Sequence, residues 1–282
     1  MLLVVTSASG INGDGYGALL AFGTDGSSRG VFCHDARISD PRGLAFDQNE
    51  GLLFINSGAD RVLALDAKGH VVRDTGPVAG LNPGGANFAP DGRLVVGMRT
   101  ARSLMAFATS LDQPGQRILP QGVVPFPRGF AFGTNGRLFL ASGIGPDGEG
   151  NNSIRAFNPA MELIPSWQVD DRELSPLDLT IAPNGNVVVS SECPFGVPDA
   201  VTTLREYDAG DGRLVRVFSA AGMAEFRKPR GLRFDHRRLY CVAQDEVLAF
   251  DFTTGACLGA VVRQPRLNGQ ALMFIPGDEP IG

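Results

Sequence analysis

Apolar and polar positions alternate over short stretches of the chain, and glycine-rich turns separate these stretches. No long segment has the 3.6-residue period of an amphipathic helix, so the pattern predicts short β-strands. One segment, which combines proline or glycine with apolar residues, recurs at 41–46, 83–88, 127–132, 176–181, 229–234 and 268–274. The copies follow one another at intervals of roughly forty to fifty-five residues, the scale of a β-propeller blade.

Each copy is followed by further strand-like segments. In the second unit, PRGLAF leads through a turn into LLFINS, then RVLALD and HVVRD. Asn-Gly, Asp-Gly or Glu-Gly pairs stand between the first two strands of most units, and such pairs are a strong local signal for a β-hairpin. Four strands in each of six units predict an all-β fold, a six-bladed β-propeller of four-stranded antiparallel blades.

The two ends of the chain complement each other. The chain opens with segments that match the second, third and fourth strands of a unit, and it closes with QALMFIP, which matches an isolated first strand. Joining them would close the ring and pair the strand edges that the ends leave open. We therefore expect one domain over 1–282, with blades at approximately 268–282 plus 1–40, 41–82, 83–126, 127–174, 175–228 and 229–267.

Composition narrows the class of partner. The 282 residues carry a net charge of −5, and this acidic balance argues against nucleic-acid binding, which usually needs a basic face. No apolar run is long enough to cross a membrane, and the N-terminus lacks the basic region of a signal peptide, so we expect a cytoplasmic protein. No metal-like spacing separates the cysteines, which we expect to be free thiols: Cys33, Cys193, Cys241 and Cys257.

The recurring motif resembles the NHL repeat. It consists of Pro-x-Gly, an Asp-Gly or Asn-Gly turn, a strand that ends in Asn/Ser-Ser-Gly and a strand that begins with arginine, and 40–69 is its best copy. The resemblance covers essentially the whole chain and implies a propeller distantly similar to the regucalcin-like gluconolactonases and the streptogramin-type lyases. It is specific for architecture and not for activity, because that superfamily includes both enzymes and scaffolds.

The site residues of those two enzyme families do not transfer to this chain. The resemblance to gluconolactonases implies a divalent cation at the top of the central channel, held by Glu, Asn and Asp side chains, largely at the residue before the motif glycine. Here Asn268 is the one potential ligand among the residues at that position, which are Arg42, Gly84, Arg128, Leu177, Arg230 and Asn268. The lyases use a His-Glu-His group, and none of the three histidines occupies an equivalent position near a glutamate.

Arginine occupies the position before the motif glycine in alternate units, as Arg42, Arg128 and Arg230. In a propeller this position rims the central channel, so three guanidinium groups would converge on one axis. Guanidinium binds carboxylate or phosphate in a forked geometry. One hypothesis is therefore a channel mouth that binds a small anionic ligand, with Asn268 beside it. The alternative is that each arginine pairs with a neighbouring acid.

The loops after the second strands supply further candidates. Ser142 belongs to a row of serines at this level, which either form a polar ring or cap the local backbone. The loop ASGIGPDGEGNN at 141–152 is neither a phosphate-binding P-loop nor an EF-hand, and we expect Ser142 and Asp147 to contact a ligand there. A looser calcium site formed by Asp147 and Glu149 is the alternative, and no other cofactor is predicted.

Glu192 ends the second strand of the fifth unit and leads a proline-containing insertion at 191–202. In an enzyme it would be the general base, with a nearby arginine stabilising negative charge that develops on the substrate. Two functions stay open. One is a small-molecule site at the top of the channel, in a hydrolase or lyase that acts on an anionic or lactone-like substrate. The other is a non-catalytic interaction scaffold, which fits the lack of a complete catalytic set.

Overall fold

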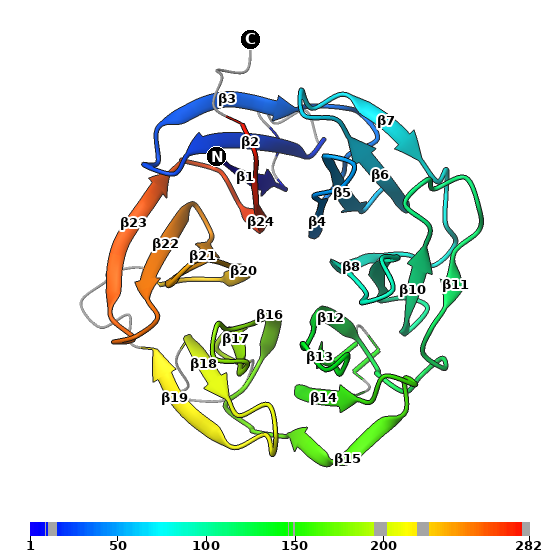
Figure 1. Cartoon of the computed structure of the whole chain (residues 1–282), viewed down its shortest axis with the longest axis vertical. Helices are drawn as coiled ribbons and strands as arrows, with labels where there is room; N and C mark the ends of the chain where they lie inside the picture. Colours follow the sequence, from blue (N-terminus) through cyan, green and yellow to red (C-terminus); the bar gives the residue numbers. More distant parts are fainter. Residues whose placement is uncertain are drawn as a thin grey trace.

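Six four-stranded blades surround a central axis in the computed structural model (Figure 1). The structure describes residues 1–8, 10, 16–145, 147–148, 150–194, 202–218 and 226–277. The predicted all-β propeller is confirmed, since these residues form 24 strands in six antiparallel sheets. Over the same residues, no helix is present that could cross a membrane.

The first blade combines both ends of the chain, in the order β24 (Gly269–Ile275), β1 (Leu2–Ser7), β2 (Ala18–Gly23) and β3 (Ser28–Cys33). The second blade contains β4 (Gly43–Asp47), β5 (Leu52–Ser57), β6 (Arg61–Leu65) and β7 (Val71–Asp74). The third contains β8 (Pro83–Phe88), β9 (Leu94–Met98), β10 (Ser103–Phe107) and β11 (Gln116–Arg117).

The remaining three blades run outward from the axis in chain order. The fourth contains β12 (Pro127–Phe132), β13 (Leu138–Ser142), β14 (Ser153–Phe157) and β15 (Leu163–Val169). The fifth contains β16 (Pro176–Ile181), β17 (Val187–Ser191), β18 (Thr203–Tyr207) and β19 (Leu214–Phe218). The sixth contains β20 (Pro229–Asp235), β21 (Arg238–Ala243), β22 (Glu246–Asp251) and β23 (Cys257–Arg263). The strands β24, β4, β8, β12, β16 and β20 are therefore the inner strands that line the axis.

The seam of the ring is the pair formed by β24 and β1. Their antiparallel register runs from Leu2 opposite Ile275 to Ser7 opposite Gly269. The hydroxyl of Thr6, which is fully buried, accepts hydrogen bonds from the N–H groups of Gln270 (3.2 Å) and Ala271 (2.9 Å). This side chain satisfies backbone groups where the ladder is irregular, so the last strand is tied firmly to the first.

The motif glycines let the inner strands approach one another near the axis. A Cβ atom added to Gly43 would lie 2.5 Å from the backbone nitrogen of Ala86 in the next blade. A Cβ atom added to Gly231 would lie 2.7 Å from the Cα atom of Ala271. A larger residue would therefore push neighbouring blades apart, which explains why Pro-x-Gly recurs at the start of the inner strands.

The core lies between the faces of adjacent blades, where the apolar positions of neighbouring sheets meet. Trp167 of β15 is buried there, 4.9 Å between ring centroids from Phe139, and its indole N–H donates to the carbonyl of Asp208 (3.1 Å). The fourth strand of the third blade is short. Of the segment QRILP only Gln116–Arg117 form a strand, and the N–H of Ile118 still donates to the carbonyl of Leu104 (3.0 Å).

Candidate functional site

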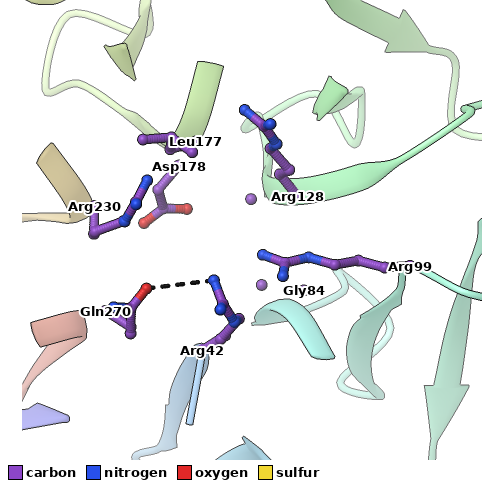
Figure 2. Close-up of a pocket in the computed structure, with 10 residues that line it drawn as sticks. Arg42, Gly84, Arg99, Arg128, Leu177, Asp178, Arg230 and Gln270 are labelled. Atoms are coloured by element: carbon purple, nitrogen blue, oxygen red, sulfur yellow. Dashed lines mark hydrogen bonds between the residues drawn. The ribbon is translucent and has the colours of Figure 1, made fainter. Parts of the chain in front are cut away.

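Four arginines line one cavity at the end of the channel where the inner strands begin (Figure 2). We call this group, Arg42, Arg99, Arg128 and Arg230, the axial arginine cluster. It encloses a cavity of about 30 Å³. The cavity is completed by Gly84, Gly85, Gly129, Leu177, Asp178 and Gln270. The structure thus brings together the three arginines that the repeat pattern singles out and adds a fourth.

Gln270, rather than Asn268, occupies the cavity position of the first blade. Ser7 lies opposite Gly269 in the first blade, as Ser142 lies opposite Pro127 in the fourth. Gln270 follows Gly269 and Arg128 follows Pro127, so the two residues are equivalent. The sequence alignment of this copy was therefore wrong by two residues, because the copy lacks the proline that marks the register elsewhere. The Gln270 carboxamide contacts Arg42 (3.4 Å), whereas Asn268 does not line the cavity.

Arg99 reaches the cavity from a loop and not from an inner strand. It is the first residue after β9, just as Glu192 is the first residue after β17. Its guanidinium carbon lies 5.3 Å from the ring centroid of Phe126, and that of Arg128 lies 5.9 Å from the same centroid. The sequence analysis considered this loop position for Glu192 and missed it for Arg99, although the two residues are equivalent in the repeat.

The four arginines differ in how they are neutralised. Arg42 pairs with Asp40 (Nε to Oδ2, 2.7 Å) and Arg230 pairs with Glu192 (Nη2 to Oε1, 2.8 Å). Arg128 instead donates to the carbonyl of Pro176 (2.8 Å). Within the described ranges of the chain, no carboxylate forms an ion pair with Arg99 or Arg128. Two guanidinium groups at the cavity therefore lack an ion-pair partner among the described residues, although Asp40 attracts Arg99 and Glu192 attracts Arg128 from farther away.

The pKa values of these two guanidinium groups follow from their surroundings. Burial, together with the nearby charges of Arg42 and Arg128, lowers the pKa of Arg99 to about 9. Burial also lowers the pKa of Arg128 to about 10, an effect that Glu192 opposes and Arg230 assists. Both groups still carry a positive charge at neutral pH, so the cavity is a site of concentrated positive potential.

Two positions near Arg128 shape the cavity. Gly143 lies directly against the Arg128 guanidinium, and a Cβ atom there would overlap it. In the inner strand of the fifth blade, Asp178 occupies the position that is a glycine in four other inner strands. These glycines are Gly43, Gly85, Gly129 and Gly231. Its side chain fits because the neighbouring Gly129 has no side chain of its own.

Asp178 is the carboxylate that lines the cavity, and it was missed by the sequence analysis. Its Oδ2 atom accepts a hydrogen bond from the N–H of Leu232 (2.9 Å) and lies 3.3 Å from Nη1 of Arg233. Burial raises the pKa of this carboxyl group, although Arg233 and the Leu232 N–H oppose the shift. The ion pair with Arg233 connects the fifth and sixth blades.

The other candidates from the sequence lie away from the cavity. Ser142 is buried and its hydroxyl accepts from the N–H of Phe126 (3.4 Å), so it caps the local backbone. Asp147 forms an ion pair with Arg102 of the third blade. Glu149 lies outside the described residues. The three histidines His34, His70 and His236 are exposed and do not line the cavity.

A divalent cation does not fit this site. The part of the chain that the structure describes has no group of three or more His, Cys, Asp or Glu side chains that could hold a metal ion. The cavity presents four guanidinium groups, which repel a cation, and Asp178 is already paired with Arg233. The four cysteines are free thiols in this structure, and only Cys193, next to Glu192, is exposed.

Comparison with known proteins shows the fold alone. No family model and no curated protein matches the sequence. A chain of a nidogen–laminin complex is similar in structure, with a TM-score of 0.76 and 12% identity over 96% of this chain and 97% of that one. A gluconolactonase from Xanthomonas campestris has a TM-score of 0.63 and 18% identity (83% and 79% of the chains). A streptogramin B lyase has a TM-score of 0.61 and 14% identity (85% and 74%).

Proposed function

We propose that the axial arginine cluster binds a small anionic ligand at the mouth of the central channel. The observation that carries the proposal is the convergence of four guanidinium groups on one cavity, two of them without a carboxylate partner among the described residues. Holding like charges together in a partly buried site is unfavourable unless an anion compensates them. An arrangement of this kind therefore fits a ligand site better than a structural ion-pair network.

The test is a binding titration with a panel of small anions, namely phosphate, citrate, malonate and acetate, by isothermal titration calorimetry in a buffer without other multivalent anions. We expect Arg128→Ala to weaken binding of the preferred anion about tenfold or more, because a hydrogen bond to a charged group contributes about 1.5–3 kcal/mol. Arg213→Ala removes an exposed arginine far from the axis and should leave the affinity unchanged.

If the Arg128→Ala variant binds every anion as well as the wild-type protein does, the proposed site is wrong. If no anion binds at all, the non-catalytic interaction scaffold becomes the better description of this propeller. The nidogen–laminin complex is an example of a similar fold found in a protein assembly.

A second candidate function is hydrolysis or elimination at the same site. The observation that favours it is the Glu192–Arg230 pair, which puts a partly exposed carboxylate and a guanidinium side by side at the cavity rim. Such a pair can supply a general base and stabilise a developing oxyanion. The similar gluconolactonase makes a sugar lactone the first substrate to try.

The catalytic hypothesis predicts that the wild-type protein accelerates the opening of a sugar δ-lactone. The reaction is monitored at neutral pH through the proton that the product acid releases. Glu192→Gln should reduce that rate by about a hundredfold or more, since general-base catalysis contributes roughly 10²–10⁴ in rate. Anion affinity in this variant should be unchanged or higher, because Arg230 then loses its internal carboxylate partner. Equal rates for Glu192→Gln and wild-type protein would exclude Glu192 as the base.

A further inference from the structure

The charges around the cavity can be paired off one by one. Asp40 compensates Arg42, Glu192 compensates Arg230, and Asp178 compensates Arg233 below them. Arg99 and Arg128 are left, and both lie near the ring of Phe126. Among the described residues, the excess at the cavity is thus two positive charges, on two guanidinium groups that both lie beside Phe126, and this excess matches a ligand group with two negative charges.

Unused hydrogen-bond donors point to the same conclusion. The Nε atom of Arg99 is buried and has no hydrogen-bond partner among the described residues, and the same is true of the Nε atom of Arg230. A buried donor without an acceptor is costly, so sites of this kind normally receive an acceptor from a ligand or a water molecule. In Figure 2 the Arg99 guanidinium extends into the opening between Arg128 and Arg42.

The size of the cavity limits how the two negative charges can be arranged. Its volume of about 30 Å³ holds little more than one water molecule, so one or two oxygen atoms of a ligand fit inside and its remaining atoms would lie in the mouth. A dicarboxylate carries its charges on two separated groups, whereas a phosphate carries about 1.5 to 2 charges on one tetrahedral group at neutral pH. Forked guanidinium donors suit the oxygens of such a group.

Resting on the anion site proposed above, we infer that the ligand is a phosphate group, either inorganic phosphate or the terminal phosphate of a monoester, bound between Arg99 and Arg128. Arg42, Arg230 and Gln270 complete the wall around it. Asp178 lies at the floor of the cavity, where its ion pair with Arg233 keeps its charge from dominating the site.

The experiment measures binding of inorganic phosphate, phenyl phosphate, malonate and acetate to the full chain, by calorimetry and by the ³¹P signal of the two phosphates. We expect phosphate to bind saturably and at least about tenfold more tightly than malonate or acetate. Arg99→Ala and Arg128→Ala should each weaken phosphate binding about tenfold or more, and Arg213→Ala should not. Circular dichroism spectra of the variants verify that they are folded.

Each outcome is decisive. Tight binding of phosphate alone assigns the site to the free anion, and tight binding of both phosphates assigns it to a monoester with its organic part outside. Saturable, Arg128-dependent binding of malonate or acetate without phosphate overturns this inference and leaves the anion site standing. Phosphate binding that Arg99→Ala does not weaken also overturns it, and absence of any Arg128-dependent anion binding removes both proposals.

Discussion

Under the proposed function, Arg99 is a residue that serves binding at the expense of stability. Its guanidinium is partly buried beside Arg42 and Arg128, and no carboxylate in the described part of the chain forms an ion pair with it, although Asp40 attracts it from farther away. An unpaired charge in such surroundings destabilises the folded state. Its guanidinium carbon lies 5.3 Å from the ring centroid of Phe126, which is a favourable contact.

We therefore predict that Arg99→Ala stabilises the ligand-free protein, by about 1 kcal/mol in the free energy of unfolding and by roughly 2 °C in Tm. The measurement is thermal unfolding followed by circular dichroism in a buffer without phosphate. In saturating phosphate the order should reverse, because only the wild-type protein gains the binding energy. A lower Tm for Arg99→Ala without phosphate would mean that the arginine is a structural residue.

Individual residues of the candidate site also differ in whether the sequence alone could identify them. Arg42, Arg128 and Arg230 could be identified because they share one position in a repeat. Asp178 could not, because four other blades carry a glycine at its position and its partner Arg233 lies in another blade, 55 residues along the chain. Asn268 was chosen in place of Gln270 because the last copy lacks the proline that marks the register. Residues whose role depends on a neighbouring blade leave no local signal.

At the scale of strands, a buried glutamate connects the fifth and sixth blades. Glu206 of β18 is 1% exposed. Its carboxylate accepts hydrogen bonds from the side chains of Asn184 (2.8 Å), Asn186 (2.7 Å) and Arg216 (2.6 Å). Arg216 continues to the carbonyl of Phe252 in the sixth blade. A hairpin turn, two strands and the adjacent blade are thus joined through one carboxylate.

Burial by itself would raise the pKa of Glu206, but these three donors outweigh it and the pKa is lowered. A carboxyl group whose folded-state pKa is depressed stabilises the protein above its unfolded pKa of about 4.3. That contribution disappears as the pH falls through the lowered folded-state value.

Glu206→Gln should therefore reduce the free energy of unfolding by about 1.5–3 kcal/mol at pH 7. At pH 3 the difference from wild-type protein should be smaller, because below about pH 4.3 the unfolded chain takes up a proton that the folded carboxylate resists. Urea unfolding at the two pH values measures both quantities, and Glu162→Gln, on the surface of the fourth blade, is the control. A stability loss of equal size at both pH values would contradict the charge argument.

At the scale of the whole molecule, the six-bladed ring could be predicted because every blade repeats the same pattern. Strand alternation, hairpin turns and the isolated last strand each indicate the same closed architecture, and local and global signals agree. The volume of the central cavity was beyond sequence reasoning, because it depends on how six inner strands approach one another. The glycines that allow this approach are visible in the sequence, but their effect appears only when the blades are assembled.

The seam between β1 and β24 also determines how the ring would respond to mechanical tension. Leu2 and Ile275 are directly opposed, so both ends of the chain leave this antiparallel pair at the same end. A force applied between the two termini would break the hydrogen bonds of the pair one after another, from Leu2 toward Ser7, and would not load them together in shear. We expect the ring to open at low force at this seam, because hydrogen bonds and side-chain packing, and no covalent link, join β24 to β1 there.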